Sequence, residues 1–209
     1  MTRGKFITLE GGEGAGKSTQ VNFLADFLRH KNIDVVQTRE VGGAPSAEAI
    51  RDLWLLKGEG YWDHLSELFL IMAARREHLV KTIWPALDRG AWVISDRFND
   101  SSRAYQGIGL GLGLDVVEDL YRRIAPQFEP DLTLLLDLPV EAGLARMSAR
   151  RGQDDRYQQK EIVFHQQLRE AYLALAHQDA HRFRIIDASV APTTVSEAIA
   201  HAVQGHFKL

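Results

Sequence analysis

The chain has 209 residues, 45% of them hydrophobic, and a formal net charge of −3, which suits one globular domain spanning residues 1–209. The small negative charge argues against nucleic-acid or membrane partners, and the lack of cysteine excludes disulfides, thiolate metal sites and cysteine nucleophiles. The sequence shows neither a secretory leader nor an apolar run long enough to span a membrane, so we expect a cytoplasmic protein.

The first predicted element is a short apolar strand over residues 6–10, followed directly by a glycine-rich loop. The loop reads Gly-Gly-Glu-Gly-Ala-Gly-Lys-Ser from Gly11 to Ser18 and precedes an amphipathic helix, which is the setting that a P-loop requires. Backbone N–H groups of such a loop bind phosphate, helped by the helix N-terminus. The residues predicted to bind a nucleoside triphosphate here are Gly11, Gly12, Glu13, Gly14, Ala15, Gly16, Lys17, Ser18 and Thr19.

The rest of the chain alternates strands with helices. Hydrophobic periodicity and turn residues place further strands and helices in sequence, with Pro85 marking a kink in a long helical region. The expected strands are residues 33–38, 91–95, 132–138 and 183–186, and the expected helices are residues 17–28, 46–56, 64–88, 100–106, 116–124, 140–149, 161–176 and 193–203. This order predicts an α/β fold in which a five-stranded parallel sheet is doubly wound, with helices on both faces.

Charged residues follow the predicted strand at residues 91–95. Asp96 at the end of an apolar strand in a P-loop protein is the arrangement that orients Mg²⁺, and Ser18 is its expected companion ligand. Arg97 beside it suits a phosphate oxygen. The alternative is a surface ion pair that caps a helix.

Two further segments carry charge close to the expected phosphates. Glu13 lies inside the P-loop, where its carboxylate would repel a triphosphate unless it points toward the sugar of a second ligand. Residues 150–157 contain Arg150, Arg151 and Arg156 in a stretch too polar to pack, which suits an arginine-bearing lid that closes over the transferring phosphoryl group. A solvated charged loop is the alternative reading.

A polar ridge is predicted on the helix at residues 100–106. Ser101 neighbours Tyr105, and Ser102 neighbours Gln106, one helical turn apart. An amide side chain both donates and accepts hydrogen bonds, so Gln106 suits the edge of a pyrimidine base.

With these residues assembled, the chain resembles the bacterial thymidylate kinases along its whole length. The resemblance rests on Glu-Gly-Gly-Glu-Gly-Ala-Gly-Lys-Ser from Glu10, Thr-Arg-Glu-Val-Gly-Gly from Thr38, Ala-Ala-Arg-Arg-Glu-His-Leu from Ala73, Asp-Arg-Phe-Asn-Asp-Ser-Ser-Arg-Ala-Tyr-Gln-Gly from Asp96 and Pro-Asp-Leu-Thr-Leu-Leu-Leu-Asp-Leu from Pro130. The segment from Asp96 is the most specific of these.

The resemblance implies a role for each matching residue. It implies transfer of a phosphoryl group from MgATP to dTMP, with Lys17, Arg97, Arg151 and Arg156 as catalytic residues and Arg146 stacked on adenine near residues 188–192. It also implies a homodimer. The substrate contacts that it implies are Glu13 and Tyr105 at the sugar, Glu40, Arg51 and Arg97 at the acceptor phosphate, and Ile71, Arg75, Ser102 and Gln106 at the base.

The chain departs from the family pattern at three positions. The family usually has proline at Val41, an aromatic residue at Ile71 and glutamate at Gln158. Because a cis bond before valine costs about 2.5–4 kcal/mol, we predict a trans Glu40–Val41 bond. We also expect Ile71→Phe to tighten dTMP binding, since an aromatic ring stacks more extensively on a base.

The predicted function is therefore ATP-dependent phosphorylation of dTMP to dTDP. Two alternatives stay open at this point. One is a kinase for another nucleoside monophosphate or for a deoxynucleoside, and the other is a nucleotide-binding regulatory protein that has lost turnover through the three departures.

Overall fold

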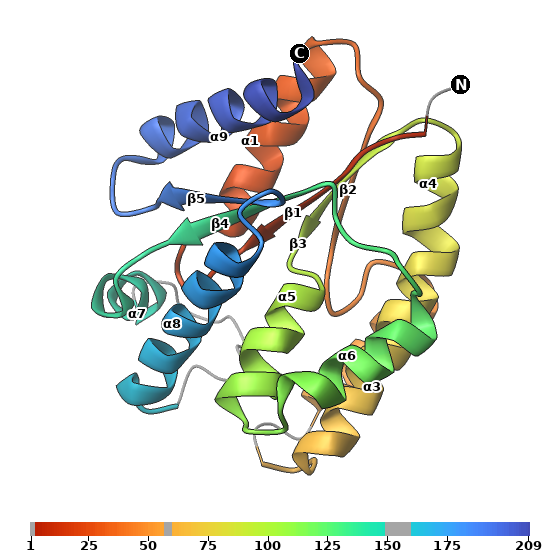
Figure 1. The fold of residues 1–209 in the computed structure, drawn as a ribbon, viewed down its shortest axis with the longest axis vertical. Helices are drawn as coiled ribbons and strands as arrows, with labels where there is room; N and C mark the ends of the chain where they lie inside the picture. The colour runs from red at the N-terminus through yellow and green to blue at the C-terminus, as the bar shows by residue number, and fades with distance from the viewer. Residues whose placement is uncertain (1–2, 57–59, 149–159) are drawn as a thin grey trace.

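The computed structural model describes residues 3–56, 60–148 and 160–209 and centres on a parallel sheet (Figure 1). Its strands are β1 (Phe6–Glu10), β2 (Val35–Arg39), β3 (Trp92–Asp96), β4 (Leu132–Asp137) and β5 (Phe183–Asp187). Their order across the sheet is β2-β3-β1-β4-β5, and every neighbouring pair is parallel. The predicted doubly wound α/β fold is thus confirmed, and the carboxyl ends of β1 and β3 lie side by side.

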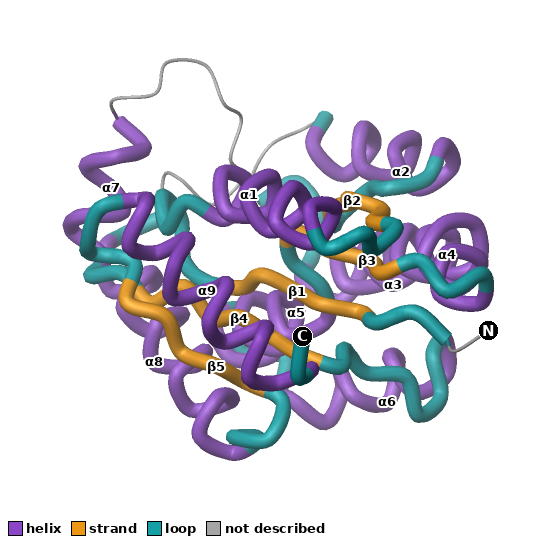
Figure 2. The backbone as a smooth tube through the Cα atoms, turned by 90° about the horizontal axis from the view of Figure 1, so that it is seen from above, coloured by secondary structure: helices purple, strands orange, loops and turns teal. Residues whose placement is uncertain are grey.

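Helices cover both faces of the sheet. One face carries α1 (Lys17–His30) and α9 (Pro192–Phe207), which Figure 2 shows lying over the strands. The other face carries α3 (His64–His78), α6 (Leu114–Ile124) and α8 (Ile162–Gln178), while α2 (Pro45–Leu55) packs on α3 and α7 (Val140–Ser148) follows β4. Of the helices in the described part of the chain, none combines the length and apolar content needed to cross a bilayer.

Side chains of β1 alternate between the two faces of the sheet. Ile7 and Leu9 belong to the apolar core beneath α1 and α9, whereas Phe6 packs in the core on the opposite face. The same alternation directs Glu10 to the face of Phe6, where it contacts Ser101. The last residue of this strand therefore lies on the side of the sheet that carries the ridge predicted at residues 100–106.

The long helical region at residues 64–88 is interrupted, as Pro85 predicted. Helix α3 continues into a π-helical turn, η1 (Leu79–Ile83), and then into α4 (Trp84–Asp88). Proline lacks an N–H group, so the regular bond to the residue four positions earlier is missing. The wider turn directly before Trp84 accommodates that loss.

The segment after β3 differs from the helix expected at residues 100–106. A short helix, α5 (Asn99–Ser102), runs into a π-helix, η2 (Arg103–Gly109), so the helical segment extends beyond the predicted end at residue 106. A Cβ atom on Gly109 would lie 2.9 Å from Leu168 and 3.0 Å from Phe164. Glycine thus lets η2 approach α8 closely, which hydrophobic periodicity does not reveal.

Candidate active site

The P-loop connects β1 to α1 and folds around the side chain of Lys17. The Lys17 Nζ atom donates to the carbonyl oxygens of Gly11 (3.1 Å) and Gly12 (2.9 Å), and the side chain is buried. Burial, and after it the charge of Arg97, lowers the pKa of Lys17. An ammonium group enclosed by the loop is suited to neutralise phosphate oxygens.

Glycine is required in this loop for a close contact with α7. A Cβ atom on Gly14, whose φ is +69°, would lie 2.3 Å from the Gly143 carbonyl oxygen. Residues 11–18 therefore pack against the helix that follows β4, as well as joining β1 to α1. The glycine pattern that predicted a phosphate loop also serves this packing.

Ser18 and Asp96, the two predicted metal ligands, lie together. The Ser18 hydroxyl donates to the Asp96 carboxylate at 2.6 Å. No group of three or more His, Asp or Glu side chains suited to a metal occurs among the described residues. A hydroxyl and a single carboxylate fit Mg²⁺, which commonly takes one or two protein oxygens and completes its shell with phosphates and water.

Arg97 links the P-loop to η2. Its Nη2 atom donates to Glu13 (2.6 Å) and to the Tyr105 hydroxyl (3.1 Å), and Tyr105 donates to the same carboxylate oxygen of Glu13. Its Nη1 atom donates to the Gly11 carbonyl oxygen (3.1 Å), which Lys17 also contacts. Two cations therefore meet at one backbone oxygen, and the predicted orientation of Glu13 away from the P-loop phosphates agrees with its contacts.

A cavity of about 150 Å³ opens beside Arg97, between α2, α3 and η2. All the predicted substrate contacts line this cavity: Glu13, Glu40, Arg51, Ile71, Arg75, Arg97, Ser102, Tyr105 and Gln106. Five further residues line the cavity without having been predicted as substrate contacts, namely Val41, Trp54, Leu55, Phe98 and Ser101. Trp54 could have been inferred, because it follows Arg51 by three residues on the same helical face.

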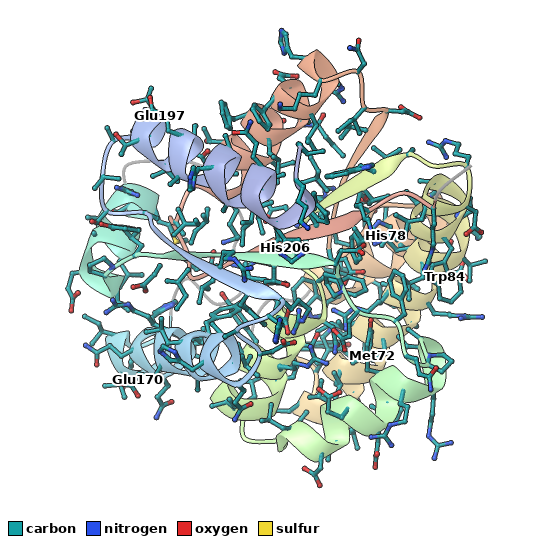
Figure 3. The ribbon with its side chains drawn as sticks, turned by 45° about the horizontal axis from the view of Figure 1, so that its top comes forward. Met72, His78, Trp84, Glu170, Glu197 and His206 are labelled. Carbon is teal, nitrogen blue, oxygen red and sulfur yellow. The ribbon has the colours of Figure 1, made fainter. Side chains whose placement is uncertain are left out.

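Arg75 holds one wall of the cavity through a buried ion pair. Its Nε atom donates to Glu40 at 2.7 Å, and Nη1 and Nη2 donate to Asn99 (2.8 Å) and Ser102 (3.0 Å). Glu40 also bonds to Nδ1 of His78, at 3.0 Å (Figure 3 labels His78 on α3). Burial favours a raised pKa for Glu40, but Arg75 and His78 outweigh it and lower that pKa.

The other predicted substrate contacts also have protein partners. The Gln106 amide donates to Glu67 at 3.0 Å, and Arg51 donates to the Val41 carbonyl oxygen at 2.6 Å. The predicted ridge therefore borders the cavity, but part of its hydrogen-bonding capacity is directed to α3. A ligand would meet groups that the protein already holds in place.

The predicted trans bond between Glu40 and Val41 is wrong, since the bond is cis. Groups on both sides of this bond are fixed by the site. The Glu40 N–H donates to the Asp96 carbonyl oxygen at 3.0 Å, the Glu40 carboxylate is held by Arg75, and the Val41 carbonyl accepts from Arg51. The intrinsic preference of a bond before valine favours trans, but these contacts come from residues distant in sequence and are not visible in the local sequence.

The two remaining predictions concern the helix after β4 and the segment that follows it. Arg146 on α7 donates to the Ala188 carbonyl oxygen at 3.1 Å, so the side chain and backbone predicted to enclose adenine do meet. The predicted lid at residues 150–157, with Arg150, Arg151 and Arg156, lies outside the described residues, as does Gln158.

A P-loop after β1, a carboxylate on the last residue of β3 and a separate arginine-lined cavity beside them define a P-loop kinase with its own acceptor site. The thymidylate kinase family model matches residues 9–199. The chain belongs to the thymidylate kinase family. The fold and family expected from the sequence are thus confirmed.

Individual relatives match over nearly the whole chain. The thymidylate kinase of Alkalilimnicola ehrlichii is 48% identical, with 97% of this chain and 95% of the relative covered. That of Chromohalobacter salexigens is 49% identical over 96% and 95%. The crystal structure of thymidylate kinase from Ehrlichia chaffeensis superposes with a TM-score of 0.77 at 34% identity, covering 97% of this chain and 99% of that one.

Proposed function

We propose that the cavity between α2, α3 and η2 holds dTMP while the P-loop holds ATP, so that the two phosphate chains meet beside Gly11. The chain is a phosphotransferase that phosphorylates dTMP to dTDP with ATP. The observation that carries this placement is the pair of hydrogen bonds, each 3.1 Å, from Lys17 and Arg97 to the Gly11 carbonyl oxygen. A cation of the proposed ATP site and a cation of the proposed dTMP site therefore bind the same backbone oxygen.

Arg97 and Arg51 bind the acceptor phosphate at the P-loop end of the cavity. Glu13 and Tyr105, which are hydrogen-bonded to one another, face the sugar. Ile71, Arg75, Ser102 and Gln106 surround the base, Arg75 as a fixed wall because its guanidinium is bonded to Glu40 and Ser102. The acceptor is already an anion, so positioning and charge neutralisation suffice and no protein base is required.

Ser18 and Asp96 would hold Mg²⁺, which would supply positive charge to the phosphates of ATP. Lys17 adds charge from the enclosed side of the P-loop, and Arg146 faces the adenine. Arg151 and Arg156 complete the catalytic set as lid residues, as the resemblance implies. The hydrogen bond between Ser18 and Asp96 at 2.6 Å supports the metal position, because it brings two oxygen ligands together.

The protein acts in the cytoplasm, among the nucleotide pools that supply ATP and dTMP, and it acts as a homodimer. Apolar side chains that remain exposed on α3, Leu65 (40%) and Phe69 (52%), support a subunit contact on this helix. They are four residues apart and therefore share a face. Analytical ultracentrifugation of the purified protein measures the oligomeric state, and a monomer at micromolar concentration would contradict the proposal.

A substrate panel tests the proposed function. ADP release is measured with dTMP, dUMP, dCMP, dGMP and thymidine as acceptors, each at the same concentration. We expect dTMP to give the highest kcat/KM and thymidine to give essentially no turnover, because Arg51 and Arg97 require a phosphate on the acceptor. Comparable turnover of thymidine would contradict the placement of the acceptor phosphate.

A further inference from the structure

Glu10 is a buried carboxylate for which the proposed reaction has no use. It ends β1, its exposed fraction is 0%, and it is absent from the described residues that line the cavity. Burial, and after it the charge of Asp100, raises the pKa of Glu10 to about 7. The chain thus keeps a carboxylate where the environment disfavours its charge, which calls for an explanation in terms of its contacts.

The first contact of Glu10 fixes the backbone next to Arg97. One carboxylate oxygen of Glu10 accepts from the Phe98 N–H at 2.7 Å. Arg97 itself has φ +70°, a left-handed conformation that is unusual for arginine, and its carbonyl oxygen accepts from the Ser95 hydroxyl at 2.7 Å. Glu10 and Ser95 therefore hold the N–H and the carbonyl oxygen of the single peptide group that joins Arg97 to Phe98.

The second contact fixes the guanidinium of Arg97. The other carboxylate oxygen of Glu10 accepts from the Ser101 hydroxyl at 2.6 Å and lies 3.4 Å from the Tyr172 hydroxyl. Arg97 Nη1 donates to these same two hydroxyls, each at 3.1 Å. Nη1 is thus held from the Glu10 side, which leaves Nη2 directed toward Glu13 and the cavity.

We propose that Glu10 is a positioning residue for phosphoryl transfer, one that aims Arg97 at the acceptor phosphate through Phe98, Ser101 and Tyr172. This inference rests on the proposed function, because it takes Arg97 to be the phosphate ligand. One carboxyl oxygen of Glu10 accepts a hydrogen bond from the Ser101 hydroxyl, which leaves the Ser101 oxygen free to accept from Arg97. The backbone and the guanidinium of Arg97 are then each held in one orientation.

Glu10→Gln tests the inference with little change in shape. The glutamine oxygen still accepts from Phe98, but its NH₂ group donates to Ser101 and competes there with Arg97. We expect kcat/KM for dTMP to fall on the order of 10- to 100-fold, the scale for a misaimed catalytic group. The KM for ATP should stay within about twofold of the wild-type value, because the P-loop contacts of Lys17 do not involve Glu10.

Asp100→Asn is the matched control, since it also removes a buried negative charge and Asp100 is likewise 0% exposed. Asp100 bonds to Arg103 and Arg182 instead of to the partners of Arg97. We expect this variant to lower Tm while kcat/KM for dTMP keeps its wild-type value. If Glu10→Gln does not fold, Ser101→Ala replaces it, and the same selective loss for dTMP is expected.

Two outcomes would overturn the inference. One is a wild-type kcat/KM for dTMP in Glu10→Gln, and the other is an equal loss for ATP and dTMP, as a general structural defect would give. Arg97→Ala separates this failure from that of the proposed function. If Arg97→Ala retains full kcat/KM for dTMP, the proposed function fails; if only Glu10→Gln does so, the role of Glu10 alone fails.

Discussion

Two clusters of arginine and carboxylate side chains, each centred on a buried carboxylate, lie on the same side of the sheet but differ in what borders them. In the Arg75 cluster, defined as Arg75, Glu40, His78, Asn99 and Ser102, three members line the cavity. In the Asp100 cluster, defined as Asp100, Arg103, Arg182, Glu118 and Glu129, none of the members is among the described lining residues. Buried ion pairs alone therefore do not mark a site; an adjoining cavity does.

The largest expected effect comes from breaking the Arg75 cluster. Among the described residues, Arg75→Met leaves the buried Glu40 with His78 as its remaining side-chain partner, and loss of one partner of a buried pair costs about 3–5 kcal/mol. Because Arg75 and Glu40 also line the cavity, the KM for dTMP should rise together with the loss of stability. Urea unfolding and steady-state kinetics measure both. If the variant loses stability but keeps the wild-type KM for dTMP, the Arg75 cluster has a structural role only, like that expected of the Asp100 cluster.

Breaking the Asp100 cluster should affect stability alone. Arg182→Met removes the hydrogen bonds of 2.6 and 3.1 Å that Arg182 donates to Asp100. Asp100 still accepts from Arg103, so we expect a loss of stability near the lower end of the same range, about 3 kcal/mol. Kinetic constants measured well below Tm should match those of the wild type. A raised KM for dTMP in this variant would show that the two clusters are coupled and would weaken the comparison.

The pH dependence of stability distinguishes two buried carboxylates. The lowered pKa of Glu40 means that its contribution is present above its unfolded pKa and is lost as the pH falls through its folded value. The pKa of Glu10 is raised to about 7 from an ordinary value of 4.5, which means that the folded protein prefers the neutral form of Glu10. The free energy of unfolding should therefore fall as the pH rises from 4.5 to 7. Urea unfolding from pH 2 to 8 checks both signs.

Matched amide variants assign each part of that pH profile. Glu10→Gln should remove the loss of stability between pH 4.5 and 7 while leaving the acid limb in place. Glu40→Gln should flatten the acid limb, after an overall loss of stability. Profiles that keep their shape in both variants would mean that other groups control the pH dependence.

The smallest expected effect concerns the base. Trp54 and Ile71 belong to one buried apolar cluster and line the same cavity from α2 and α3. Stacking of an aromatic side chain on a base is worth about 1–3 kcal/mol, so Trp54→Leu should weaken dTMP binding about tenfold. Ile71→Phe should tighten it, and by more when Trp54 is leucine. Calorimetric titration of the four variants measures the coupling, and equal gains in both backgrounds would mean that Trp54 makes no stacking contact.

Many of the functional residues at the carboxyl edge of the sheet could be predicted, because they lie in short contiguous sequence motifs. The P-loop fixed the end of β1, and a polar pair after an apolar strand identified Asp96 and Arg97. The parallel register, which pairs Leu9 with Asp96, then brings these groups together in any fold of this kind. The phosphate end of the site was therefore accessible from local sequence.

Features that depend on distant contacts could not be predicted. The cis Glu40–Val41 bond is surrounded by groups from β3, α2 and α3. Gly109 of η2 lies close to α8, and Arg182 reaches Asp100 from 82 residues away. In each case the sequence offers only a local preference, and a tertiary contact overrides it.

The most direct test of the central claim, that Arg97 holds the phosphate of dTMP in this cavity, compares the binding of dTMP and of thymidine by calorimetry. A hydrogen bond to a charged group contributes about 1.5–3 kcal/mol, so the wild type should bind dTMP on the order of a hundredfold or more tightly than thymidine. In Arg97→Ala this advantage should shrink at least about tenfold while thymidine affinity stays unchanged. An advantage of undiminished size in Arg97→Ala would contradict the account.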